Sequence, residues 1–327
     1  MANELDLITA RRMLRTRDDL LRDGLTDREI SARVAAELLI RVRRGRYVDA
    51  AQWHGLWNEG RHLLQVLAFD LNADAAGPVF WGPSAAVLHG LPLYRLAPTA
   101  VHVVILGERH TRTRTGVSWH DVAISDADIV EIDGIRCTSL DRTVLDMACF
   151  AREEVGLSVT DAALRREAVA GHVQDEDRAA EWRRRLTDRA DMRHTRGIRQ
   201  ARRIVEFADG RAQLPGESVS RLQLNRLGYR DIELQVHVVG PDQEDYWMDF
   251  GFPRSQAFGE FDGGGKYVRA DMTGGRAPEQ IVFDEKIRED IVRGVTGRRT
   301  TRWGSEHIGT LDGFARRLQA FGIRPPG

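Results

Sequence analysis

The sequence predicts a multidomain α/β protein, and three observations support this fold class. The chain has 327 residues, more than one ordinary core accommodates, so two or three domains are expected. Its hydrophobic content of 42% is sufficient for globular packing. Segments with helical spacing and segments with strand alternation occur in separate blocks along the chain. We divide it into residues 1–58, 59–152, 153–210 and 211–327.

The composition excludes several classes of protein. The N-terminus carries acidic residues and has no apolar core segment, so we expect no secretory signal. No run approaches the ~20 apolar residues of a membrane helix, so no membrane partner is expected. Cys137 and Cys149 are the only cysteines and have no CxxC spacing. A disulfide framework or zinc cluster is therefore not expected, and a reducing cytoplasm fits best.

The net charge of −1 conceals an uneven distribution of basic residues, which are almost all arginine. A near-neutral protein can bind nucleic acid where its basic residues share a face. Arginine runs on helices also occur as ordinary solvated surface. The runs lie at residues 41–46, 109–114, 183–203 and 298–302.

Residues 1–58 are predicted to form a small helical unit that ends in a hairpin. Thr26 and Glu29 have the spacing of a capping box and start a predicted helix, TDREISARVAAELL. Ile30, Val34 and Leu38 repeat every four residues and are expected to form its buried stripe. The following LIRVRRGRYVDA predicts two strands around a basic turn at Arg44-Gly45.

Two helices followed by a basic hairpin is the order of a winged helix-turn-helix, a DNA-binding unit. The second helix would enter the major groove, and the arginines of the hairpin would contact phosphates. The alternative is a helical cap whose arginines only keep it soluble. The candidate DNA-binding residues are Arg28, Arg33, Arg41, Arg43, Arg44 and Arg46.

Residues 59–152 are predicted to be mixed α/β. PSAAVLHGLPLY and LDRTVLDMACFA indicate helices, whereas AVHVVIL, GVSWHDVAI and DIVEIDGIRCTS indicate strands. The loop GERHTRTRTG, between the first two strands, is either a second phosphate-contacting loop or a solvated hairpin tip.

The order of these blocks is similar to a known family. A winged helix, WGPSAAVLHGLPL, HTRTRTGVSWH and DGIRCTSLDRTVLDMA together resemble actinobacterial relatives of the AbiEi antitoxins, the DNA-binding partners in type IV toxin–antitoxin operons. The resemblance covers about residues 5–150. It implies operator binding through the winged helix and a cognate toxin as the partner.

Residues 153–210 are predicted to be a charged helical connector. Few of its positions are apolar. The residues expected to dock it are Trp182, Leu186, Ile198, Ile204 and Phe207.

In residues 211–327, a predicted helix begins after Pro215-Gly216 and carries Glu217 in its first turn. IELQVHVVG then alternates strictly and predicts a half-buried strand. The next strand is YWMDFGF, in which Asp249 is expected on the face opposite Met248 and Phe250. In QAFGEFDGGGKY, the residues Phe258, Glu260 and Asp262 share one face by strand parity.

If these two strands pair antiparallel, Asp249 and Glu260 reach a common point. Carboxylates that converge there repel each other unless a cation compensates them, and oxygen ligands suit Mg²⁺ or Mn²⁺. The predicted metal ligands are Asp249, Glu260 and Asp262, with Lys266 as a neighbouring positive charge. The alternative is a set of ordinary surface carboxylates at strand ends.

The motifs PGES, YWMDFGFP, GEFDGGGKY and DEKIREDIVRG resemble the PD-(D/E)XK (restriction-endonuclease-like) nuclease fold, and within it the branch related to Vsr very-short-patch repair endonucleases. The resemblance covers about residues 211–310. It implies that Asp249 is the first catalytic acid, Glu260 the second and Glu217 the helix glutamate. The position of the superfamily's lysine holds Asp262 instead, and Lys266 lies further along.

These observations predict a protein that binds double-stranded DNA and carries a metal-dependent endonuclease-type domain. Asp249, Glu260, Lys266 and Glu217 would form its catalytic set and hydrolyse phosphodiester bonds with Mg²⁺ or Mn²⁺. The alternative is a non-catalytic antitoxin or transcriptional regulator of AbiEi type that binds operator DNA.

Overall fold

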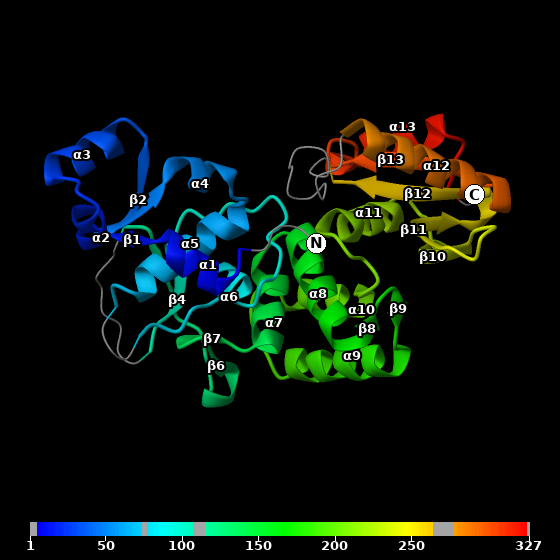
Figure 1. Cartoon of the computed structure of the whole chain (residues 1–327). Helices are drawn as coiled ribbons and strands as arrows, with labels where there is room; N and C mark the ends of the chain where they lie inside the picture. Colours follow the sequence, from blue (N-terminus) through cyan, green and yellow to red (C-terminus); the bar gives the residue numbers. More distant parts are fainter. Residues whose placement is uncertain (1–4, 74–76, 107–114, 264–277, 326–327) are drawn as a thin grey trace. The chain divides into compact units, whose positions relative to one another are not determined.

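The computed structural model describes residues 5–73, 77–106, 115–263 and 278–325. Helices and short sheets alternate along the chain, which confirms a mixed α/β protein (Figure 1). The chain packs into two compact units. The N-terminal unit comprises Met1–Val159 and Leu186–Ile204, and the C-terminal unit comprises Thr160–Arg185 and Val205–Gly327.

The N-terminal unit starts with a three-stranded sheet and three helices. In chain order these are α1 (Leu7–Met13), β1 (Arg15–Thr16), α2 (Arg17–Arg22), α3 (Asp27–Ala35), β2 (Leu39–Arg43) and β3 (Arg46–Asp49). The sheet has the order β1-β3-β2. The predicted capping box of Thr26 and Glu29 is confirmed, as is the basic hairpin. Leu20, Ile30, Leu39 and Tyr47 form the core.

One part of the predicted helical stripe is wrong. Helix α3 ends at Ala35, and Glu37 then adopts a left-handed backbone with φ of +53°. Leu38 therefore follows the helix instead of belonging to it, and it is 62% exposed.

The rest of this unit contains the predicted helices and strands, with one refinement. Its elements are α4 (Ala50–Gly55), α5 (Asn58–Asp70), α6 (Pro83–Leu88), β4 (Val101–Val104), β5 (Val117–His120), β6 (Ile129–Ile132), β7 (Ile135–Thr138) and α7 (Leu140–Phe150). Strands β4 and β5 are parallel. DIVEIDGIRCTS forms a hairpin of two strands, because Asp133 and Gly134 both have positive φ, as a tight hairpin turn requires.

The segment expected to be a helical connector contains α8 (Glu153–Ala168), α9 (Glu176–Asp191) and α10 (Ile198–Phe207). Between α8 and α9 the chain forms a small hairpin of β8 (Val169–Ala170) and β9 (Val173–Gln174), so the expectation of an all-helical segment is wrong here. Gly171 and His172 make its two-residue turn.

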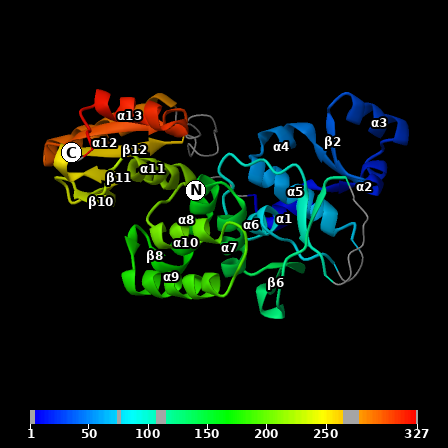
Figure 2. The ribbon, with the colours of Figure 1, turned by 180° about the vertical axis from the view of Figure 1, so that it is seen from behind.

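The C-terminal unit is built on a four-stranded sheet of order β10-β11-β12-β13, and Figure 2 labels the first three of these strands. Its elements are α11 (Pro215–Arg226), β10 (Glu233–Val239), β11 (Asp245–Phe252), β12 (Ala257–Asp262), α12 (Pro278–Thr296), β13 (Arg299–Gly304) and α13 (Leu311–Ala320). The first three strands pair antiparallel, and β13 is parallel to β12.

Different helices cover the two faces of this sheet. Phe258 packs with Val292 of α12 on one face. On the other, Trp303 donates a hydrogen bond to the Ser220 hydroxyl of α11 at 2.8 Å and packs against Phe314 of α13. The strands thus have two buried faces.

The strict alternation predicted for β10 and β11 is broken. Gln235 is buried and has a left-handed backbone with φ of +49°. Met248 packs with Phe258, whereas Phe250 pairs with Gly259 on the opposite face of β12. Met248 and Phe250 therefore do not share a face, contrary to the prediction, because the irregularity falls between them at Asp249.

Candidate functional site

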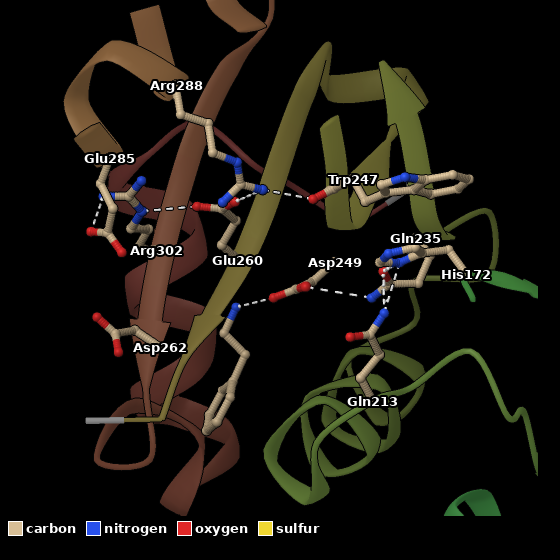
Figure 3. A pocket seen from close by; sticks show the side chains of 11 residues that line it. His172, Gln213, Gln235, Trp247, Asp249, Glu260, Asp262, Glu285, Arg288 and Arg302 are labelled. Atoms are coloured by element: carbon tan, nitrogen blue, oxygen red, sulfur yellow. Dashed lines mark hydrogen bonds and ion pairs between the residues drawn. The ribbon is translucent and has the colours of Figure 1, made fainter. Parts of the chain in front are cut away.

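A pocket of about 160 Å³ lies in the C-terminal unit (Figure 3). Residues from the β8–β9 hairpin, the segment before α11, all four sheet strands and α12 line it. They are His172, Gln213, Gln235, Trp247, Asp249, Glu260, Phe261, Asp262, Glu285, Arg288 and Arg302. The three predicted acids, Asp249, Glu260 and Asp262, are thus brought together in one pocket.

The strand register places the first two acids near each other. Phe250 pairs with Gly259 at the end of the antiparallel β11–β12 ladder, and Asp249 and Glu260 are the residues just beyond this pair. The backbone N–H of Phe261 donates to Asp249 Oδ2 at 2.8 Å. This bond anchors one oxygen of Asp249 to the neighbouring strand.

Glu217 lies behind the pocket instead of lining it. Its side chain is 4% exposed, and its Oε2 accepts a hydrogen bond from the backbone N–H of Gln213 at 2.8 Å. The amide nitrogen of Gln235 lies 3.4 Å from Glu217 Oε2 and 3.4 Å from Asp249 Oδ1. Gln235 therefore connects the helix glutamate to the pocket aspartate.

Glu260 carries two ion pairs that sequence reasoning missed. Its carboxylate is 2.9 Å from Arg302 Nε and 3.0 Å from Arg288 Nη2. Arg302 also faces Glu285 and Glu289 at 3.8 and 3.6 Å. Burial acts to lower the pKa of Arg302, but the bond to Glu260 and these carboxylates outweigh it and raise the pKa. The sequence analysis expected a metal ion, with Lys266 as a positive neighbour, to compensate the acids, and the guanidinium groups of Arg288 and Arg302 supply part of that compensation.

The donor chemistry of the pocket fits a hard cation, since Asp249, Glu260 and Asp262 all offer carboxylate oxygens. Within the described ranges, no three His, Cys, Asp or Glu side chains stand close enough together to hold a metal ion. A bound ion would therefore draw the carboxylates closer to one another. Lys266 lies outside the described residues.

Two histidine rings stack on Trp247, one of the pocket-lining residues. The His172 ring stacks on Trp247 with centroids 4.4 Å apart and planes 6° apart. His237 also stacks on Trp247, at 4.6 Å. Sequence reasoning missed His172, Gln213, Gln235 and Trp247 as pocket residues. For His172, a Gly-X dipeptide between two short strand-like pairs was the available signal.

The six arginines predicted to bind DNA fall into two groups. Arg28, Arg33, Arg41 and Arg44 are exposed. Arg43 lies over the Phe69 ring at 4.4 Å, and Arg46 donates to Asn72 Oδ1 at 3.0 Å. The hairpin arginines therefore include two that fasten the hairpin to α5 and the turn after it. The arginine-rich loop at 107–114 lies outside the described residues.

Comparison with known proteins gives distant relatives. No family model matches the chain. Proteins of Mycobacterium tuberculosis strains CDC 1551 and H37Rv, both described only as uncharacterized, are 28% identical over 228 residues, which covers 69% of this chain and 77% of theirs. Among the described helices, none is long and apolar enough to cross a membrane. The chain is thus a mixed α/β protein with a polar pocket in its C-terminal unit.

Proposed function

We propose that the chain binds double-stranded DNA and that its C-terminal unit is a metal-dependent DNA endonuclease of the PD-(D/E)XK fold, related to the Vsr branch. The observation that carries the proposal is that Asp249, Glu260 and Asp262 line one pocket. The element order also supports it: a helix, three antiparallel strands, a second helix and a parallel strand. The acids come from two strands, and Glu217 reaches them through Gln235.

The chain's own residues suggest how such a site would work. Asp249, Glu260 and Asp262 would hold Mg²⁺ or Mn²⁺, which lowers the pKa of water and offsets charge on the phosphate. Arg288 and Arg302 add fixed positive charge on the same wall, next to Glu260. They would attract and orient a phosphodiester and stabilise the charge that builds up during hydrolysis.

The N-terminal 58 residues would supply DNA binding as a winged helix-turn-helix. The order of α1, β1, α2, α3, β2 and β3 supports this assignment, since α2 and α3 precede a basic hairpin. Arg28 and Arg33 project from α3, and Arg41 and Arg44 from the hairpin, all exposed to solvent. They would contact bases and phosphates, while Arg43 and Arg46 hold the hairpin in place.

The second candidate function is a non-catalytic antitoxin or regulator of AbiEi type, which binds operator DNA and a cognate toxin. The compensation of Glu260 by two arginines favours it, because a carboxylate that is already paired needs no cation. In that case the C-terminal unit would act only as a surface for DNA or a partner.

Cleavage of supercoiled plasmid separates the two functions. We expect the full chain to nick or linearise plasmid with Mg²⁺ or Mn²⁺, to stop in chelator, and to lose cleavage in Asp249→Asn. The matched control is Asp290→Asn, because Asp290 is an exposed carboxylate of α12 outside the pocket. If wild type cuts no DNA of any sequence tested, or if Asp249→Asn cuts as well as wild type, the endonuclease proposal fails.

A further inference from the structure

His172 reaches the pocket from a separate segment, at the tip of the β8–β9 hairpin. Gly171 precedes it with φ of +60°, a conformation that glycine adopts without strain in a two-residue turn. Arg165 Nη2 donates to the Gly171 carbonyl at 2.7 Å. The hairpin tip is therefore tied to α8, and the imidazole is held on a short, anchored turn.

The orientation of the Gln235 amide follows from its neighbours. Both Glu217 Oε2 and Asp249 Oδ1 face the same end of this side chain, and ionised carboxylates only accept hydrogen bonds. That end must therefore be the NH₂ group. The carbonyl end, Oε1, then lies 2.8 Å from Nδ1 of His172.

Two side chains face Nδ1 of His172. Gln235 Oε1 accepts only, so it would take a hydrogen bond from a protonated Nδ1. Gln213 Nε2 donates to Gln235 Oε1, at 3.0 Å, and lies 2.8 Å from Nδ1, so it would donate to an unprotonated Nδ1. The tautomer that serves the role proposed below is the one with the proton on Nδ1.

In that tautomer the second ring nitrogen presents a lone pair. Nε2 of His172 makes no hydrogen bond with any residue in the described part of the chain. Stacking on Trp247 fixes the ring plane. His172 lines the same pocket as Asp249 and Glu260, so a molecule bound in this pocket lies beside the imidazole.

We propose that His172 is the general base of this site, an inference that rests on the proposed nuclease function. Nε2 accepts a proton from water while the water oxygen forms its bond to phosphorus. The bond from phosphorus to the leaving sugar oxygen breaks, and that oxygen takes a proton from solvent. His172 later returns its proton to solvent.

The surroundings stabilise the imidazolium that this step creates. Its Nδ1–H donates to Gln235, whose amide in turn faces the negative charges of Glu217 and Asp249. The arrangement resembles an acid–base–orienting-group relay, with Gln235 as the positioning residue. In the PD-(D/E)XK pattern a lysine occupies the position of Asp262, and His172 would take over the proton transfer expected of that lysine.

Kinetics of His172→Ala test the proposal. We expect kcat to fall by roughly 10²–10⁴-fold, the usual contribution of a general base, with little change in KM. DNA affinity measured with Ca²⁺ should stay unchanged, and added imidazole should restore part of kcat. His237→Ala is the matched control, because His237 stacks on the same Trp247 but does not line the pocket.

The tautomer gives a readout that needs no cleavage. Long-range ¹H–¹⁵N NMR of the full chain should show His172 protonated on Nδ1, and Gln235→Leu should shift it toward the Nε2–H form. Wild type in the Nε2–H form overturns the relay. If wild type cuts DNA and His172→Ala cuts equally well, the general-base role fails alone. A wild type that cuts nothing overturns the proposed function and this role together.

Discussion

Gln235 and Asp249 occupy the interruption of the β10–β11 ladder, between the pairs Leu234–Phe250 and Val236–Met248. The amide nitrogen of Gln235 approaches Asp249 Oδ1 at 3.4 Å from a backbone with φ of +49°. Backbone strain of this kind persists only where surrounding contacts impose it, and it is common at functional sites. Here the left-handed backbone of Gln235 directs its buried amide toward the pocket. Beyond this point, the side chains of both strands that faced one side of the sheet face the other.

The strain at Gln235 can be measured by comparing two substitutions. Gln235→Ala and Gln235→Gly both remove the amide and its bonds, but only glycine adopts the left-handed backbone without penalty. We expect Gln235→Gly to be more stable by roughly 0.5–1 kcal/mol, since the penalty of about 1–2 kcal/mol exceeds the entropic cost of glycine. Urea unfolding gives the free energies. Equal stabilities, or a more stable alanine variant, would show that this backbone is unstrained.

The ion pairs of Glu260 are expected to stabilise the C-terminal unit. Arg302→Met keeps the aliphatic stem but leaves Glu260, Glu285 and Glu289 with less positive charge. We predict a loss of about 1.5–3 kcal/mol, the range for hydrogen bonds to charged groups. Arg316→Met on the exposed side of α13 serves as control and should change stability by less than ~0.5 kcal/mol. Similar unfolding midpoints for both variants would rule out a stabilising role.

His62 should make the stability of the N-terminal unit pH-dependent. Its side chain is 1% exposed, and burial lowers the pKa to about 4. The unfolded chain binds this proton near pH 6.5, so stability is fully present above that pH and declines as the pH falls toward 4. The loss amounts to about 3 kcal/mol. Burial also lowers the pKa of His102 to about 4, which acts in the same direction.

Urea unfolding between pH 7 and 4.5 tests this with His62→Gln, which should weaken the pH dependence by about one proton. His54→Gln is the control, because His54 is exposed. A His62→Gln variant with the wild-type slope would contradict the predicted titration.

The exposed and the fastened arginines of the hairpin should behave differently. Arg41→Ala combined with Arg44→Ala is expected to weaken DNA binding and to lower the salt slope by roughly two, without a change in melting temperature. Arg46→Ala should instead lower the melting temperature, since Arg46 binds Asn72 and the Leu71 carbonyl. Titration of a labelled DNA duplex at several salt concentrations measures the affinity and the salt slope, and thermal melts measure the melting temperature of each variant. If the double variant binds DNA as well as wild type, the N-terminal residues are a helical cap whose arginines only keep it soluble.

Local patterns allowed several features to be predicted from the sequence. The capping box at Thr26 depends on residues three apart, and the acidic pair depends on parity within two neighbouring strands. Both follow from short-range geometry. Leu38 was misplaced because periodicity does not reveal where a helix ends, and the break occurs at a left-handed Glu37.

The remaining pocket residues depend on contacts distant in sequence. His172 meets Trp247 and Gln235 only after a hairpin at 169–174 packs beside the sheet. Arg302 meets Glu260 because β13 pairs parallel with β12, a pairing that strand alternation alone does not specify. The interruption of strand alternation at Gln235 also could not be predicted, because the polar and apolar residues around it alternate as in a regular strand.

The buried pair of Arg221 and Asp161 has a consequence for protein production. Arg221 Nη2 lies 3.0 Å from both oxygens of Asp161, and the two side chains are 7% and 0% exposed. A recombinant fragment that starts at residue 211 would keep the sheet and its acids but lose Asp161 and His172. In such a fragment the Arg221 guanidinium would be buried without its partner, and breaking a buried ion pair in this way costs about 3–5 kcal/mol. Expression trials of the C-terminal unit should therefore begin upstream of α8.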